Sequence, residues 1–305
     1  MTRDTMNEKA EAKALMPQTA WPTLSFMTAL IAVHWGMVWL GLSGRVPMLA
    51  LVLPLGFTTY AHYTLVHESI HGNILRDRSL AWLHTLIGWY GSLMLSLTWP
   101  LLSRTHKNHH SYVNSEKDPD LYVKMSFPRL LLRNLVSWAL QALPILLLRQ
   151  VFKDRSPSRG YINADEIMSR SERIQHHATN IALVLAMWGF VLAGYGWQVL
   201  LLYYLPVYFA ANLLIIFFQW LPHHPFTETS RYRATRNTGH RWLNAVFIWQ
   251  NWHLMHHLWP GVPFYNYERL YHRIRPILED KGARHEEGVV PKAGPIQTSG
   301  PQAAE

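Results

Sequence analysis

The histidines of this 305-residue chain fall into groups with the spacing of metal ligands. One pair has the pattern H-x-x-x-H and two triplets have the pattern H-x-x-H-H. Within each group the side chains therefore lie three or four residues apart and share one face of a helix. One further histidine follows a proline at the end of a long apolar stretch. The nine candidate ligands are His67, His71, His106, His109, His110, His223, His253, His256 and His257.

Nine imidazoles are too many for one zinc ion, which takes four ligands in structural sites and three protein ligands in catalytic ones. They suit two metal ions that have four or five ligands each and room for an exogenous ligand. The chain contains no cysteine, which excludes disulfides, thiolate ligands and iron–sulfur clusters. Imidazole suits iron, copper, zinc and nickel. We predict two non-haem iron ions, ahead of copper and of zinc.

The segment His67–His71 also fits H-E-x-x-H, in which two helical histidines bind zinc and the glutamate is the general base of a metalloprotease. A zinc protease needs neither of the two H-x-x-H-H triplets. In addition, Glu68 points about 100° away from His67 around a helix. We therefore interpret this segment as one part of a larger metal site.

Ligating imidazoles usually donate their second N–H to a carboxylate or a carbonyl group. Glu68, Asp118 and Asp120 are candidates for this outer role, and a solvated turn is the alternative for each of them. Asn251 precedes the last triplet and could be a ligand, a hydrogen-bond donor to one, or a helix-start residue. Histidines outside the nine are interpreted as ordinary hydrogen-bonded or interfacial residues: His34, His62, His84, His176, His177, His240, His272 and His285.

Apolar blocks of about 20 residues separate these histidine groups, and a helix of this length crosses ~30 Å of hydrocarbon. Residues 21–42 and 48–66 are joined by a short link containing Gly and Pro, which predicts a helical hairpin. Residues 181–199 and 200–220 predict a second hairpin that turns near residues 195–197.

Two further apolar stretches and the two termini complete the predicted topology. Residues 80–102 span the membrane or lie partly in its interface, and residues 130–148 are expected in the interface. Residues 1–20 are polar and predict a mobile cytoplasmic N-terminal tail. Residues 21–281 then form the membrane domain, and residues 282–305, rich in Pro, Gly and Ala, predict a disordered C-terminal tail.

The formal net charge of +9 could indicate nucleic acid or a cytoplasmic membrane face as the partner. The apolar blocks favour the membrane. Lys and Arg gather in residues 76–173 and after residue 231, whereas the hairpin tips hold only Arg45. This predicts that both termini and every histidine group lie on the cytoplasmic side. We expect an all-α membrane protein of four transmembrane helices in two hairpins, with a cytoplasmic helical cap that carries the dimetal site.

Four stretches carry a resemblance to a known family: HESIHG, THKNHHSYVNSEKDPDLYV, QWLPHHPF and QNWHLMHHLWPGVPFYNYERLYHRIRPILEDKG. Their histidine boxes resemble those of the membrane di-iron fatty acid desaturase and hydroxylase superfamily. Over residues 55–282 the chain looks most like the cyanobacterial-type β-carotene hydroxylases. It departs from their pattern at Glu68, where Asp is frequent, and at His224, where Arg is frequent.

This resemblance implies two iron ions bound by the nine histidines named above, on the cytoplasmic side of a bacterial-type inner membrane. It implies no catalytic residue separate from these ligands. O₂ and two electrons would insert one oxygen atom into the β-ionone ring of a carotenoid, converting β-carotene to β-cryptoxanthin and zeaxanthin. The sequence has no nucleotide, flavin or haem motif. Electrons are therefore expected from a partner such as ferredoxin on the basic face, and nucleic acid is not expected as a partner.

Three alternatives remain open. A fatty acyl desaturase or hydroxylase has the same metals and a different substrate tunnel. A carotenoid 4-ketolase attacks another carbon of the same ring. A non-enzymatic metal transporter is disfavoured, because transporters carry ionisable residues near the middle of their spans and only His34 clearly lies there.

Overall fold

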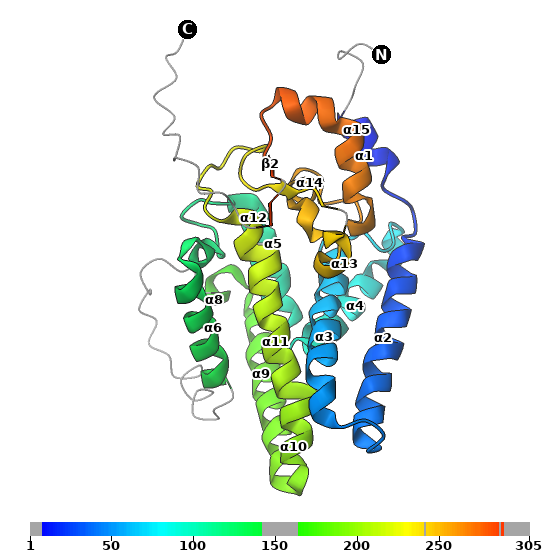
Figure 1. The fold of residues 1–305 in the computed structure, drawn as a ribbon, viewed down its shortest axis with the longest axis vertical. Coiled ribbons are helices and arrows are strands. Elements are labelled where there is room, and N and C mark those ends of the chain that lie inside the picture. The colour runs from blue at the N-terminus through cyan, green and yellow to red at the C-terminus, as the bar shows by residue number, and fades with distance from the viewer. Residues whose placement is uncertain (1–7, 142–163, 241, 287, 290–305) are drawn as a thin grey trace.

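The structure, a computed structural model, describes residues 8–141, 164–240, 242–286 and 288–289. Figure 1 shows long helices that run along the longest axis of the molecule, with a cap of short helices and loops at the end where α1 and α15 lie. The predicted mostly helical class, with helices long and apolar enough to cross a membrane, is confirmed.

Helix α3 (Met48–Ile70) is the central element of the bundle and packs against α2, α4 and α11. Helix α2 (Trp21–Leu42) begins and ends at the boundaries of the first apolar block. Most side chains in the second half of α3 are buried, whereas Trp35 and Trp39 of α2 are half exposed, as befits a helix that faces lipid. Helix α3 continues past residue 66, so its last turn carries His67.

The apolar stretch 80–102 is not one helix. The structure divides it into α4 (Ala81–Met94) and α5 (Trp99–Tyr112), which bend by 102° relative to each other. The chain turns at Ser96, whose φ is 55°. Helix α5 then starts at Trp99 with Pro100 in its first turn, where the missing N–H of proline has no helical partner to lose.

Gly194 breaks the longest apolar run, Arg170–His223. Its φ of 94° is not helical, and Figure 1 shows the chain turning back near α10 (Gly196–Val199), opposite the cap. The break lies beside the turn predicted near residues 195–197. The run also contains α9 (Arg170–Phe190), α11 (Leu205–Leu214), α12 (Leu221–His223) and π-helical turns at Val191–Tyr195, Leu200–Tyr204 and Ile215–Trp220.

Among the described residues, three helical segments are long and apolar enough to cross a membrane, or four if the bent pair α4–α5 counts as one span. The arrangement in two hairpins of four spans and the cytoplasmic position of the cap remain predictions. Helix α6 (Phe127–Gln141) covers the start of the stretch predicted to be interfacial, and residues 142–148 lie outside the described residues.

The remaining elements are short and lie mostly in the cap. The helices are α8 (Ala164–Ile167), α13 (Leu243–Phe247), α14 (His253–Leu258) and α15 (Tyr267–Asp280). The 3₁₀ turns are Arg78–Leu80, Leu121–Lys124, Gln250–Trp252 and Phe264–Asn266. Strands β1 (Asn237–Thr238) and β2 (His285–Glu286) pair in parallel.

The N-terminal segment predicted to be a mobile tail contains a helix in the structure. Residues Glu8–Ala14 form helix α1, which packs against α15. The carboxylate of Glu8 accepts hydrogen bonds from Arg231 at 3.1 Å and from the Tyr232 hydroxyl at 2.7 Å. A polar composition suggested a solvated tail, but it does not reveal that a charged side chain such as Glu8 pairs with residues of the cap.

The predicted disordered C-terminal tail also begins with ordered structure. Strand β2 lies within the first residues of this tail, and its partner β1 is about fifty residues earlier in the chain. Residues 290–305 lie outside the described residues.

The close approach of α3 and α4 gives a test of this packing. A Cβ atom at Gly91 would lie 2.9 Å from the carbonyl oxygen of His62 and 2.8 Å from Val66 Cγ2. We expect Gly91→Ala to push the helices apart and to lower the free energy of unfolding by about 1–3 kcal/mol, as overpacking does, measured by thermal unfolding in detergent. Gly36→Ala, with no neighbour within 4 Å, is the control. Equal melting of both variants would contradict this packing.

Candidate metal centre

Four histidine side chains meet at one point near the cap, and we call them the first histidine group. The Nε2 atoms of His67 and His256 lie 3.0 Å apart, and those of His71 and His106 lie 2.9 Å apart. The ligand atoms of all four side chains lie within 4.8 Å of one another. These four side chains could therefore hold one metal ion between them.

A second histidine group lies beside the first and contains His109, His223, His253 and His257. The Nε2 atom of His223 lies 3.2 Å from that of His109 and 3.0 Å from that of His253. The Nε2 atoms of His253 and His257 are 3.2 Å apart. This group also has its ligand atoms within 4.8 Å of one another.

His110 lies between the two groups. Its Nε2 atom is 2.7 Å from that of His256 and 3.2 Å from that of His106, both in the first group. Its ring stacks on His257 of the second group, with ring centroids 4.4 Å apart. The structure thus brings all nine predicted candidates together, as two adjacent groups of four with His110 between them.

Helices α5 and α14 each supply both groups. On α5, His106 belongs to the first group and His109 to the second. On α14, His256 belongs to the first group, whereas His253 and His257 belong to the second. The H-x-x-H-H spacing therefore divides each triplet between two neighbouring sites, whereas α3 and α12 contribute to one site each.

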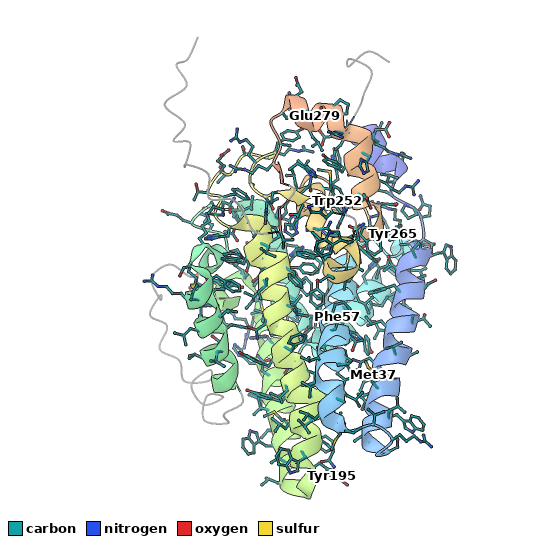
Figure 2. All side chains as sticks on the ribbon, in the orientation of Figure 1. Met37, Phe57, Tyr195, Trp252, Tyr265 and Glu279 are labelled. Atoms are coloured by element: carbon teal, nitrogen blue, oxygen red, sulfur yellow. The ribbon has the colours of Figure 1, made fainter. Side chains whose placement is uncertain are left out.

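The centre lies at the cap end of the bundle and is largely enclosed. In Figure 2, Trp252, the residue before His253, lies at that end, and Tyr195 lies at the opposite end. Six of the nine imidazoles are buried, and His71, His110 and His257 are partly exposed.

Two carboxylates hold imidazoles from the outside. His67 Nδ1 lies 3.2 Å from Glu68 Oε1, and His109 Nδ1 lies 2.9 Å from Asp118 Oδ1. An ionised carboxylate only accepts hydrogen bonds, so each Nδ1 donates its proton outward. Each Nε2 atom then presents a lone pair to its histidine group.

The Nε2 lone pairs of His67, His109 and His256 point into the histidine groups and favour a cation there. Neighbouring Nε2 atoms lie 2.7–3.2 Å apart. A hydrogen bond between two imidazoles needs a proton on one of them, and a ring whose proton is on Nδ1 has none to give. Around a four-coordinate ion with bonds of 2.0–2.1 Å, nitrogen ligands lie about 3.4 Å apart. The donor set and its spacing therefore fit a metal ion in each group.

The other predicted outer residues differ in their contacts. Asp120 Oδ2 lies 3.8 Å from His109 Nδ1, farther than Asp118. Asn251 donates instead to the carbonyl oxygen of Thr238 and to Asn244 Oδ1, both at 3.0 Å, so it supports the loops around the centre.

Sequence reasoning missed two residues next to the ligands. The hydroxyl of Tyr267 lies 3.1 Å from His256 Nδ1 and accepts its proton in the tautomer that leaves Nε2 free. The backbone N–H of Asn114 donates to Asp118 Oδ2 at 2.8 Å and orients that carboxylate. Tyr267 begins a separate helix, and a backbone N–H leaves no mark in the sequence, so no spacing rule could identify either contact.

Electrostatics in the cap favour the ligating form of seven of the nine histidines. His109 differs, because burial is outweighed by its hydrogen bond to Asp118 and by the charge of Asp120, which raise its pKa. Burial, reinforced by the neighbouring imidazoles, lowers the pKa of His253, His256 and His257 well below the usual value. These rings are therefore neutral near pH 7, the form that binds metals. Burial also raises the pKa of Asp120 to about 6, although the nearby His109 opposes this shift.

Histidines outside the nine make ordinary hydrogen bonds. In the bundle, His34 Nδ1 lies 2.8 Å from the Thr58 hydroxyl, and His62 Nδ1 lies 2.7 Å from the Thr58 carbonyl oxygen. His84 Nε2 lies 2.8 Å from the carbonyl oxygen of Leu75. The first contact joins α2 to α3, the second lies within α3 and the third ties α4 to the loop before it; none involves the two groups.

The structure combines helices long enough to cross a membrane with two adjacent groups of four imidazoles that could each hold a metal ion. The sequence model of the fatty acid desaturase family matches residues 43–288, and the chain belongs to this family. The family-level prediction is confirmed, and family and helices together indicate an integral membrane protein.

The chain is also similar to two individual proteins. The chain is 24% identical over 258 residues to the β-carotene ketolase of Paracoccus sp. (strain PC1), covering 81% of this chain and 89% of the relative. It is 23% identical over 248 residues to the β-carotene ketolase of Paracoccus sp. (strain N81106 / MBIC 01143), covering 78% and 86%.

The contact between Asp118 and His109 can be tested by metal titration. Asp118→Asn keeps the shape of the side chain and removes its charge, so we expect the metal affinity of the second group to fall about 10–100-fold. Binding of cobalt(II) to the metal-free protein, followed by visible absorption, measures this change. The control is Asp77→Asn, because Asp77 caps the turn Arg78–Leu80 at the surface. Unchanged metal affinity in Asp118→Asn would show that this carboxylate does not support the second group.

Proposed function

We propose that this protein is a membrane di-iron oxygenase that modifies the end ring of a carotenoid. The observation that carries the proposal is the pair of adjacent four-imidazole groups. One iron would be held by the first histidine group and the other by the second, with His110 between them. When bound, the irons supply the reduction of O₂ that oxygenation of a C–H bond requires.

The chain's own residues serve this reaction by positioning and by exclusion of water. Most of the imidazoles are buried, and their outer partners Glu68, Asp118 and Tyr267 fix the ring orientations. An all-nitrogen donor set without thiolates suits iron in an oxygenase. Burial also keeps bulk water from the reactive species.

Formation of a 4-keto group on the β-ionone ring is the first candidate reaction. Both relatives reported above bear the name β-carotene ketolase, and this supports ketolation over the 3-hydroxylation expected from the sequence stretches. A ketone needs two successive oxygenations of one carbon, each consuming O₂ and two electrons, followed by loss of water. Hydroxylation at C3 is the second candidate, favoured by the resemblance of residues 55–282 to the β-carotene hydroxylases.

The remaining parts of the proposal concern supply and location. The electrons come from a separate carrier such as ferredoxin, and the basic residues of the cap attract an acidic partner. We further propose that residues 21–281 form the oxygenase domain and that the cap and both termini face the cytoplasm of a bacterial-type inner membrane.

A pigment assay separates the candidate reactions. We expect cells that accumulate β-carotene to form 4-keto products when they express this chain, because the same ring carbon is oxidised twice. Liquid chromatography with mass detection identifies the products, and expression of His256→Ala is the inactive control. Zeaxanthin as the main product would favour hydroxylation. Unchanged pigment with altered acyl chains would contradict the carotenoid proposal.

The ligand assignment predicts selective loss of metal. We expect His109→Ala and His256→Ala each to remove one of the two bound irons and to reduce activity below detection, because each variant takes a nitrogen from a different group. Iron per chain is measured by mass spectrometry on purified protein. His272→Ala is the matched control, since this exposed side chain lies outside both groups. Full iron content in either ligand variant would contradict its assignment.

A further inference from the structure

The loop after α12 caps the end of that helix. Carbonyl groups in the last turn of a helix lack helical partners, and α12 ends at His223 of the second histidine group. Thr235 Oγ1 donates to the carbonyl oxygen of Pro222 at 2.8 Å. Arg236 Nε donates to the carbonyl oxygen of Leu221 at 2.9 Å. The backbone that carries His223 is therefore fixed from outside its own helix.

The same loop also caps the start of α14. The first N–H groups of a helix lack helical acceptors. The N–H of Leu254 donates to the carbonyl oxygen of Arg236 at 3.2 Å, and the N–H of Met255 donates to Asn237 Oδ1 at 3.3 Å. We call Thr235, Arg236 and Asn237 the bridge segment, because these three residues connect the ends of two helices that carry ligands.

The C-terminal segment, residues 284–286 and 288–289, holds the bridge segment in place. Arg236 as a whole is only 1% exposed. It donates through Nη1 to the carbonyl oxygen of Gly288 at 3.3 Å and through Nη2 to that of Val289 at 2.6 Å. Beside it, strand β1 pairs with strand β2. The planar fork of arginine thus joins the C-terminal segment to the end of α12.

Ring contacts hold the C-terminal segment against α15 and against the 3₁₀ turn that precedes α14. The imidazole of His285 stacks on Tyr271, with centroids 4.7 Å apart, and lies nearly parallel to Trp252 at 6.0 Å. Trp252 is the residue before His253. A Cβ atom at Gly239 would lie 2.4 Å from the His285 ring, so glycine is required for this approach.

We propose that Arg236 is a positioning residue that fixes His223 relative to His253 and so makes the second histidine group a metal site, with the C-terminal segment as its support. The first group takes one ligand from α14 and none from α12, so it depends far less on the bridge segment. The proposal rests on the proposed function only in that each group binds one ion.

Titration of metal-free protein with cobalt(II), followed by visible absorption, tests the proposal. We expect the wild-type chain to bind two ions. In Arg236→Gln one ion should bind as before and the other about 10–100-fold more weakly, the cost of losing an outer partner of a ligand. In Arg236→Lys, the affinity for the second ion should lie between those of the wild-type chain and Arg236→Gln, because one ammonium group cannot reproduce the planar fork of arginine. The control is Arg275→Gln, since this exposed arginine pairs with Glu279 on its own helix.

Double variants identify which group loses its ion. Addition of His253→Ala to Arg236→Gln should leave one bound ion, because both changes act on the second group. Addition of His71→Ala to Arg236→Gln should instead remove the ion of the first group, the one that Arg236→Gln alone still binds tightly. Equal weakening of both ions in Arg236→Gln, or two ions bound with wild-type affinity, would overturn the proposal.

Shortened chains provide the test if Arg236→Gln does not fold. A chain that ends at Ala283 lacks the C-terminal segment and should lose the second ion, whereas a chain that ends at Val289 retains every contact described above and should bind both. Two tightly bound ions in the shorter chain would overturn the proposal. Fewer than two ions in the wild-type chain would contradict the proposed function itself, which makes the two failures distinguishable.

Discussion

The structure depends on the repulsion between imidazole lone pairs that converge at two points. Nine buried or half-buried rings bring their Nε2 atoms to within about a hydrogen-bond length of one another. In three of them, His67, His109 and His256, the opposite nitrogen Nδ1 donates to an outer acceptor, which leaves Nε2 with a lone pair. Such an arrangement is unfavourable without a cation and strongly favourable with one. The helices, loops and outer hydrogen bonds must therefore hold the rings in place against that repulsion until metal is bound.

Most of the ligands lie at helix ends, and this location creates a second constraint. His67 lies in the last turn of α3, His223 ends α12, and α14 is only six residues long. Backbone groups at these ends need partners from elsewhere. The loops provide them: Asn73 donates to the carbonyl oxygen of Pro260 at 2.9 Å beside the first group, and the bridge segment caps both helix ends beside the second. The loops thus determine the geometry of the metal centre as much as the helices do.

The sequence predicted what depends on spacing and hydropathy. The bounds of α2, the break near Gly194 and the gathering of nine histidines all follow from periodic patterns, because apolar length and i, i+4 faces are local properties. The bend between α4 and α5 was missed because an apolar stretch does not reveal a change of direction. The docked helix α1, Tyr267 and Arg236 were missed because their partners lie far away in the chain, and neither charge nor polarity indicates which distant carbonyl or carboxylate a side chain will meet.

The bend between α4 and α5 also bears on the choice of substrate. Helix α5 carries His106 and His109 at an angle of 102° to α4, and α3 contributes ligands only from its last turn. The metals of the proposed oxygenase therefore lie where the apolar bundle ends, not at the middle of a span. A long polyene dissolved in the bilayer reaches such a centre with its end, so position alone favours oxidation of a terminal ring over the central chain. In the proposed carotenoid oxygenase, the residues that contact the ring would select between neighbouring ring carbons and so between a ketone and an alcohol as the product.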